Sequence, residues 1–189
     1  PVRQVSARMW DWSLEPTASL YHTANSLEPL HAQFDYLKNT VSVVNDYYLS
    51  FKGYRVVAEV YDINSKKVLA DSAVIDLPCD GVVNDALCLH FPEDISPVHF
   101  IKLRLKDETD NEVSSNFYWR STDSYEGRES LTGPATSGFE SLSLLKRASL
   151  HTSCHLRRTS DKCFVDITLR NVSGSIAFFN QLQLLDRDL

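Results

Sequence analysis

Two histidines and two cysteines near the C-terminal end are the residues best suited to chemistry, because imidazole and thiolate are common zinc ligands. They are His151, Cys154, His155 and Cys163. The surrounding residues alternate between apolar and polar, which predicts a strand. In a strand His151 and His155 share one face while Cys154 points through the other. One tetrahedral site could collect all of them only around a bulge, so the sequence predicts no metal site.

Sites for phosphate groups are also missing from the sequence. Gly127, Gly133 and Gly138 lie close together among only six glycines, and neither G-x-G-x-x-G nor G-x-x-x-x-G-K-[ST] occurs. Nineteen basic and twenty-five acidic residues give a net charge of -6, which disfavours binding to a phosphate backbone. No run approaches the roughly 18 apolar residues of a membrane span. We expect no cofactor, no nucleic acid and no membrane among the partners.

The four cysteines fall in two pairs of equal spacing, Cys79 with Cys88 and Cys154 with Cys163. Neither pair forms a C-x-x-C motif. Buried reduced thiols are the expected state, and a disulfide within either pair is the alternative, because spacing alone does not supply the geometry that a disulfide needs.

The elements that must position these residues are mostly strands. Seven short runs alternate between apolar and polar residues, with turn-forming residues between them and no helical pattern, which predicts an antiparallel sandwich of immunoglobulin type. The runs are 30–34, 41–45, 54–61, 68–77, 86–91, 99–106 and 113–119. The predicted core contains Val57, Ile101, Leu103, Leu105, Phe117 and Trp119. Ahead of the sandwich, residues 8–27 predict one or two short amphipathic helical turns.

The last part of the chain predicts an unfinished second sandwich. Residues 124–143 have the composition of a linker, and three further strands are expected at 145–156, 163–170 and 176–185. Their inward set is Val165, Ile167, Leu169, Leu182 and Leu184. Three strands cannot close a sandwich, so we expect another polypeptide, or further residues of the same one, to cover this face.

Aromatic residues cluster between the second and third predicted strands, at Tyr47, Tyr48, Phe51 and Tyr54. Tyrosine rings could form a platform that stacks on sugars. Packing is the favoured interpretation, because Tyr54 begins a core strand and most aromatic residues serve packing.

Several segments, in one order and at plausible spacings, resemble glycoside hydrolase family 2. They are Glu28-Pro29-Leu30-His31, Val41-Ser42-Val43-Val44-Asn45, Ser115-Asn116-Phe117-Tyr118-Trp119, Asn171-Val172-Ser173, Ala177-Phe178-Phe179 and Leu182-Gln183-Leu184-Leu185-Asp186. The branch most similar in appearance holds exo-β-glucosaminidases and endo-β-mannosidases acting on glycoprotein glycans, with β-mannosidases nearby. The resemblance implies a large enzyme in which a (β/α)8 barrel precedes two immunoglobulin-like domains, and it places this chain after the barrel.

The resemblance also implies boundaries and a candidate site. Residues 1–28 would end the barrel, 29–123 would form one immunoglobulin-like sandwich, 124–143 a linker and 144–189 the first strands of a second sandwich. Met9-Trp10-Asp11-Trp12 is similar to the family segment that closes the barrel, so Trp10, Asp11 and Trp12 are expected near substrate. Val2 stands where the family pattern has tryptophan and Ser6 where it has arginine.

Catalytic residues are not expected in this chain. Retaining glycoside hydrolysis needs two carboxyl groups flanking the scissile bond, and the resemblance places both glutamates in the barrel. Asn111-Glu112 is similar to the family's acid/base dipeptide, but it falls in a charged turn between strands and is interpreted as coincidence. Glu126, Glu129 and Glu140 are interpreted as solvated charges of the linker.

The function expected from the resemblance is therefore a non-catalytic segment that supports the barrel of a retaining β-glycosidase. The alternative is a stand-alone module that binds carbohydrate or protein. Because the chain begins at Pro1 and its only methionine is Met9, a longer precursor is expected. Asn171-Val172-Ser173 is a glycosylation sequon or an ordinary turn, and the family resemblance suggests a secreted, vacuolar or lysosomal route.

Overall fold

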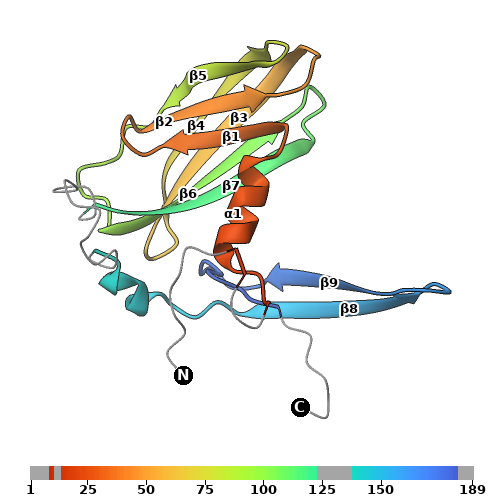
Figure 1. Ribbon diagram of the computed structural model, residues 1–189. Coiled ribbons are helices and arrows are strands. Elements are labelled where there is room, and N and C mark those ends of the chain that lie inside the picture. The colour runs from red at the N-terminus through yellow and green to blue at the C-terminus, as the bar shows by residue number, and fades with distance from the viewer. Residues whose placement is uncertain (1–8, 11–13, 123–137, 183–189) are drawn as a thin grey trace.

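The computed structural model describes residues 9–10, 14–122 and 138–182, and most of its regular structure is antiparallel strand (Figure 1). Seven strands form a sandwich of two sheets. One sheet has the order β1 (Leu30–Asp35), β2 (Thr40–Asn45), β5 (Gly81–Cys88). The other has the order β4 (Lys67–Leu77), β3 (Phe51–Asp62), β6 (Val98–Lys106), β7 (Glu112–Ser121). The predicted all-β fold with an immunoglobulin-like sandwich is confirmed.

The core lies between the two sheets and follows the two-residue period of the strands. Val41 and Val43 face inward from β2, and Ile101, Leu103 and Leu105 face inward from β6; all five are fully buried. Burying a side chain of this size contributes about 1.5 to 3 kcal/mol relative to leaving it exposed. The prediction that Ile101, Leu103 and Leu105 belong to the core is confirmed.

The prediction is wrong for three other core residues, Val57, Phe117 and Trp119, which lie on the opposite face. All three are half-buried on the outer side of the four-stranded sheet. In β3 the inward positions are Val56, Ala58 and Val60, which are fully buried. A shift of one residue in a strand moves every side chain to the opposite face.

Polar residues occupy the inward positions of β7. Asn116 is buried and its Nδ2 donates a hydrogen bond to the Ala32 carbonyl at 2.7 Å. The Tyr118 hydroxyl accepts one from the Phe34 amide at 3.4 Å. These side chains satisfy backbone groups of β1, an edge strand of the other sheet, and so close the sandwich along that side.

A single α-helix among the described residues, α1 (Ala18–Ser26), precedes the sandwich, and none of its residues is buried. It begins after Pro16, which agrees with the predicted helical turns. No helix in the described ranges is long and apolar enough to cross a membrane.

After residue 138 the chain forms a short 3-10 helix, η1 (Glu140–Leu144), and a two-stranded hairpin of β8 (Leu150–Arg158) and β9 (Cys163–Asn171). Figure 1 shows the hairpin as a ribbon apart from the sandwich strands. The predicted third strand is wrong in its described part, because residues 176–182 are not extended into a strand. Residues 183–189 lie outside the described part of the chain.

Candidate functional site

An aromatic cluster covers part of the outer face of the four-stranded sheet. Phe100 of β6 is fully buried there although it points away from the sandwich core. The ring of Phe117 stacks on it at 5.7 Å with an interplanar angle of 22°. Phe178 belongs to the segment after β9. Its ring centroid lies 5.3 Å from that of Phe100 and 5.4 Å from that of Trp119. Phe117 and Trp119 are therefore partly covered by downstream residues rather than by the sandwich interior.

Trp119 joins three parts of the chain. His22 of α1 lies 5.2 Å from its ring, and Phe179 lies 5.6 Å from it. The segment that carries these phenylalanines is also held by its backbone, because the Ile176 amide donates a hydrogen bond to Ser65 Oγ at 2.8 Å. Aromatic pairs at such distances stabilise by about 0.5 to 1.5 kcal/mol each beyond the area they bury. The helix, the sandwich and the segment after the hairpin are thus packed together at one place.

Of the residues expected near substrate, the structure describes only Trp10. Its side chain is 49% exposed, and its backbone pairs with Pro16 across a short loop. The Thr17 amide donates to the Met9 carbonyl at 3.0 Å, which closes the same loop. Asp11 and Trp12 lie outside the described residues. An exposed tryptophan on a hydrogen-bonded loop is a suitable contact residue, but it forms no enclosed site with other described residues.

One face of the hairpin is apolar and uncovered. Leu156 is paired with Val165, Cys154 with Ile167 and Thr152 with Leu169, so these side chains share a face. Leu156, Val165, Ile167 and Leu169 are 38% to 51% exposed. Leu182, predicted to join them, is 58% exposed, and Leu184 lies outside the described residues. The exposure of Val165, Ile167 and Leu169 agrees with the predicted inward-type face, which the described residues leave uncovered.

The candidate metal ligands are separated by the strands that carry them. His151 and His155 lie on the polar face of β8, and Cys154 lies on the apolar face. Cys163 is paired with Arg158 at the closed end of the hairpin, away from Cys154. The described parts of the chain contain no group of three or more His, Cys, Asp or Glu side chains that could hold a metal ion.

The expectation of buried thiols is wrong, because all four cysteines are free and exposed. Cys79 precedes β5 and Cys88 ends it. A strand rises about 3.3 Å per residue, so these two cysteines lie too far apart for a disulfide. The same reasoning applies to the second pair. Cys154 is paired with Ile167, which lies four residues along β9 from Cys163.

The carboxylates considered for catalysis do not come together. Glu112 is exposed at the start of β7, and Glu140 lies at the start of η1, where its Oε2 accepts a hydrogen bond from the Gly138 amide at 2.9 Å. Glu126 and Glu129 lie outside the described residues. Retaining hydrolysis needs two carboxyl groups about 5 to 5.5 Å apart, and the described carboxylates of this set offer no such pair.

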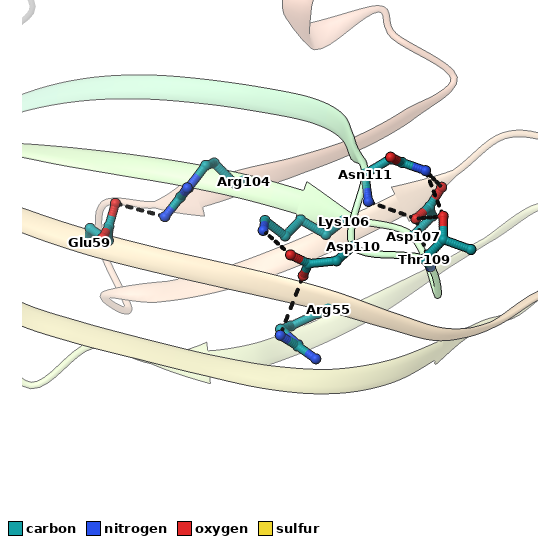
Figure 2. A network of polar contacts seen from close by, with 8 residues as sticks. All are labelled: Arg55, Glu59, Arg104, Lys106, Asp107, Thr109, Asp110 and Asn111. Atoms are coloured by element: carbon teal, nitrogen blue, oxygen red, sulfur yellow. Dashed lines mark hydrogen bonds and ion pairs between the residues drawn. The ribbon is translucent and has the colours of Figure 1, made fainter.

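The turn before Glu112 is stabilised by its own polar contacts (Figure 2). The Thr109 hydroxyl and the Asn111 amide donate to Asp107, and these bonds lower the pKa of Asp107. Lys106 donates to Asp110 at 2.8 Å and lowers the pKa of that carboxyl. The acids of this turn are therefore held ionised, which suits a structural hairpin and not a proton donor.

Sequence reasoning missed the buried carboxylate Glu59, which lies on the outer face of β3. Arg104 Nη2 is 3.0 Å from its Oε2 (Figure 2), and Lys67 and the Tyr61 hydroxyl also contact it. Burial raises the pKa of Glu59, but the hydrogen bond from Lys67 and the charge of Arg104 outweigh burial, so the pKa is lowered overall. The sequence did contain a signal for this ion-pair cluster. It was an acidic residue in the middle of a predicted strand, with lysine and arginine frequent in another predicted strand.

The sequon residue Asn171 is exposed at the end of β9. Its Nδ2 donates to the Ser175 carbonyl at 2.6 Å, and its Oδ1 accepts from the Ser173 amide at 3.0 Å. The side chain therefore serves a turn in this structure while remaining at the surface.

The fold and surfaces described above are those of a β-sandwich segment with faces left for other residues to cover. No family model matches the chain. A curated exo-β-D-glucosaminidase from Arthroderma benhamiae is 26% identical over 189 residues, which is 95% of this chain and 20% of that protein. A second, from Amycolatopsis orientalis, is 22% identical over 116 residues, 61% of this chain and 11% of that protein.

Solved structures show the same fold. The Amycolatopsis orientalis exo-chitosanase CsxA, in a complex with PNP-β-D-glucosamine, superposes with a TM-score of 0.73 at 19% identity, over 89% of this chain and 21% of that chain. A structure of the exo-β-D-glucosaminidase CsxA from an inhibition study superposes with a TM-score of 0.74 at 20% identity, over the same shares. The resemblance to exo-β-glucosaminidases inferred from the sequence is confirmed, and the chain spans about a fifth of the length of the first relative.

Proposed function

We propose that this chain is a non-catalytic segment of a larger retaining β-glycosidase that cleaves β-glucosaminidic or β-mannosidic bonds, and that it supports the catalytic barrel. The observation that carries the proposal is the match over 95% of this chain to 20% of an exo-β-D-glucosaminidase. A fragment of that size, whose described candidates Glu112 and Glu140 lie on separate elements, fits a supporting role.

The uncovered hairpin face supports a partner in the same enzyme. A two-stranded hairpin is marginally stable alone and needs a further layer on its apolar face. We propose that residues 144–189 open a second sandwich completed by the remaining polypeptide, that 29–123 form the first sandwich, that 124–143 link them and that 1–28 end the barrel. The exposed Trp10 fits this arrangement, with Trp10, Asp11 and Trp12 near the β-linked substrate held by the barrel.

The test uses the chain alone, the remaining polypeptide alone and both together. We expect turnover of a β-glucosaminide only when the remaining polypeptide is present, and co-purification of the two pieces. Ile167→Asp should weaken co-purification, because it places a charge on the apolar face. Thr168→Asp is the matched control, since Thr168 occupies the polar face of the same strand. Hydrolysis by the chain alone, or equal effects of both variants, would overturn the proposal.

Asn171 is proposed as a glycan attachment site if the enzyme passes through a eukaryotic secretory or lysosomal route. Its exposure supports this assignment, and modification would require Nδ2 to leave the Ser175 carbonyl. A mass shift on glycosidase treatment of the secreted enzyme, absent in Asn171→Gln, is the expected result. An unshifted mass for the wild-type chain would contradict it.

A further inference from the structure

The loop between β2 and β3 presents three consecutive apolar residues to solvent. Tyr47, Tyr48 and Leu49 are 45%, 83% and 65% exposed. Single exposed apolar residues are ordinary on protein surfaces, but a contiguous group that includes aromatic rings marks an interaction surface. We call these three residues the aromatic loop.

The aromatic loop is held in place by a buried side chain. Asn45 is fully buried, and its Nδ2 donates to the Leu49 carbonyl at 2.8 Å and to the Pro78 carbonyl at 2.6 Å. Its Oδ1 accepts from the Tyr47 amide at 3.0 Å. The Tyr47 ring also packs edge-on against Phe51 at 6.0 Å, and Phe51 packs on the core. A ligand that binds here therefore meets a loop backbone and a Tyr47 ring that are already held in place, which lowers the entropy cost of binding.

The surroundings of the aromatic loop are acidic. The turns 46–50, 78–80 and 107–111 lie together at one end of the sandwich, the upper right of Figure 1. The Asp80 amide donates to the Tyr47 carbonyl at 2.9 Å, which places this acid beside the loop. Residues 45–55, 76–81 and 106–112 carry seven carboxylates against three cations: Asp46, Asp76, Asp80, Asp107, Glu108, Asp110 and Glu112 against Lys52, Arg55 and Lys106.

The acidic turns also influence Tyr54, at the start of β3 beside the aromatic loop. The pKa of Tyr54 is raised, first by burial and then by the charges of Asp107 and Glu108. Tyr54 lies 5.3 Å from Phe51, which in turn contacts Tyr47. The excess of carboxylates at this end of the sandwich favours a positively charged ligand over a negatively charged one.

We propose that the aromatic loop is a binding surface for a cationic chain of β-linked amino sugars. Tyrosine rings offer apolar contact to pyranose faces and attract ammonium groups through their π-systems. The surrounding carboxylates favour binding of a positively charged sugar chain over a neutral or negatively charged one. That the ligand is an amino sugar rests on the proposed function. That the ligand is positively charged rests only on the carboxylates at this end of the sandwich.

The experiment measures binding of a glucosamine hexamer to the 189-residue chain by titration calorimetry, with the neutral N-acetylated hexamer as ligand control. We expect the glucosamine hexamer to bind more tightly than the neutral one, with an affinity that falls as salt rises. Tyr48→Ala should weaken binding by about tenfold, and Asp80→Asn should weaken it less. Tyr21→Ala is the matched control, because Tyr21 is a similarly exposed tyrosine on α1, outside this end of the sandwich.

Equal binding of both hexamers, no binding, or equal losses in Tyr48→Ala and Tyr21→Ala would overturn the inference. Burial of Tyr48 against the remaining polypeptide in the assembled enzyme, seen as loss of its reactivity toward a tyrosine reagent, would also overturn it. Co-purification with the remaining polypeptide tests the proposed function separately. A chain that co-purifies without binding the hexamer refutes only this inference, and one that binds without co-purifying refutes only the supporting role.

Discussion

The sandwich and the β8–β9 hairpin have the same alternating sequence pattern but different burial. In β6, Ile101, Leu103 and Leu105 are fully buried because a second sheet covers them. In β9, Val165, Ile167 and Leu169 repeat the pattern and remain 38% to 42% exposed. Alternation therefore predicts a strand and the face that needs a cover, while the cover itself depends on which other strands are present.

The largest expected effect comes from truncating one residue in each region. Leu103→Ala should lower the free energy of unfolding by about 2 to 5 kcal/mol, because it leaves a cavity in a closed core. Ile167→Ala in the isolated chain should change it by no more than about 0.5 kcal/mol, as for an exposed site. Urea unfolding followed by tryptophan fluorescence measures both. Equal losses would show that the hairpin face is covered in the isolated chain.

The pH dependence of the sandwich should depend on His99, which faces inward near one end of the core. Burial lowers its pKa to about 4, and its Nε2 has no hydrogen-bond partner within the described residues. The unfolded chain takes up the proton near pH 6.5 and the folded chain only near pH 4, so stability is lost as pH falls through this window. The free energy of unfolding should fall by about 3 kcal/mol, because each unit of difference between the pKa values of the unfolded and folded chain corresponds to about 1.36 kcal/mol.

Comparing unfolding of the wild type and His99→Leu at pH 7 and pH 4.5 isolates this group from the carboxylates. The difference between the two pH values should be smaller in the variant. An unchanged difference would mean that His99 is accessible to protons in the folded chain.

The contact between the two regions can be weakened at Phe178. Phe178→Ala should cost about 1 to 2 kcal/mol, because a half-buried ring and its aromatic contacts are lost. Limited proteolysis should then cleave the segment after β9 faster while the sandwich stays intact. Phe179→Ala is the control, since Phe179 is 64% exposed and should have a smaller effect. Similar rates for both variants would contradict an anchoring role for Phe178.

Much of the fold could be predicted from the sequence, and the misses have physical causes. All seven predicted sandwich runs overlap observed strands. The start of β5 is Gly81 and not residue 86. The prediction missed residues 81–85 because Gly81 and the Asn84-Asp85 pair are typical of a turn. The face of β7 was misjudged because Asn116 and Tyr118 bond to β1, a partner distant in sequence. The alternation in residues 176–182 predicts a strand, but the segment is irregular and Phe178 packs on the sandwich.

The candidate site was less predictable than the fold. Exposure of the hairpin face follows from counting strands, so Val165, Ile167 and Leu169 could be assigned in advance. The aromatic cluster could not, because Phe100, Phe117 and Phe178 come together only through tertiary folding. The ion pairs of Glu59 depend in the same way on the register of β3 and β6.

The smallest expected effect is that of Glu112→Gln, which tests whether any chemistry resides in the sandwich. Glu112 is exposed at the first position of β7, beside a turn whose acids are already held by hydrogen bonds. Removing its charge should change the free energy of unfolding by less than about 0.5 kcal/mol. In the assembled enzyme, turnover of a β-glucosaminide should be nearly unchanged, because Glu112 is exposed at the end of a hairpin turn and is not buried in a way that would tune it for proton transfer. A loss of turnover by roughly a thousandfold with the fold intact would mark a direct catalytic role and place part of the active site on this chain.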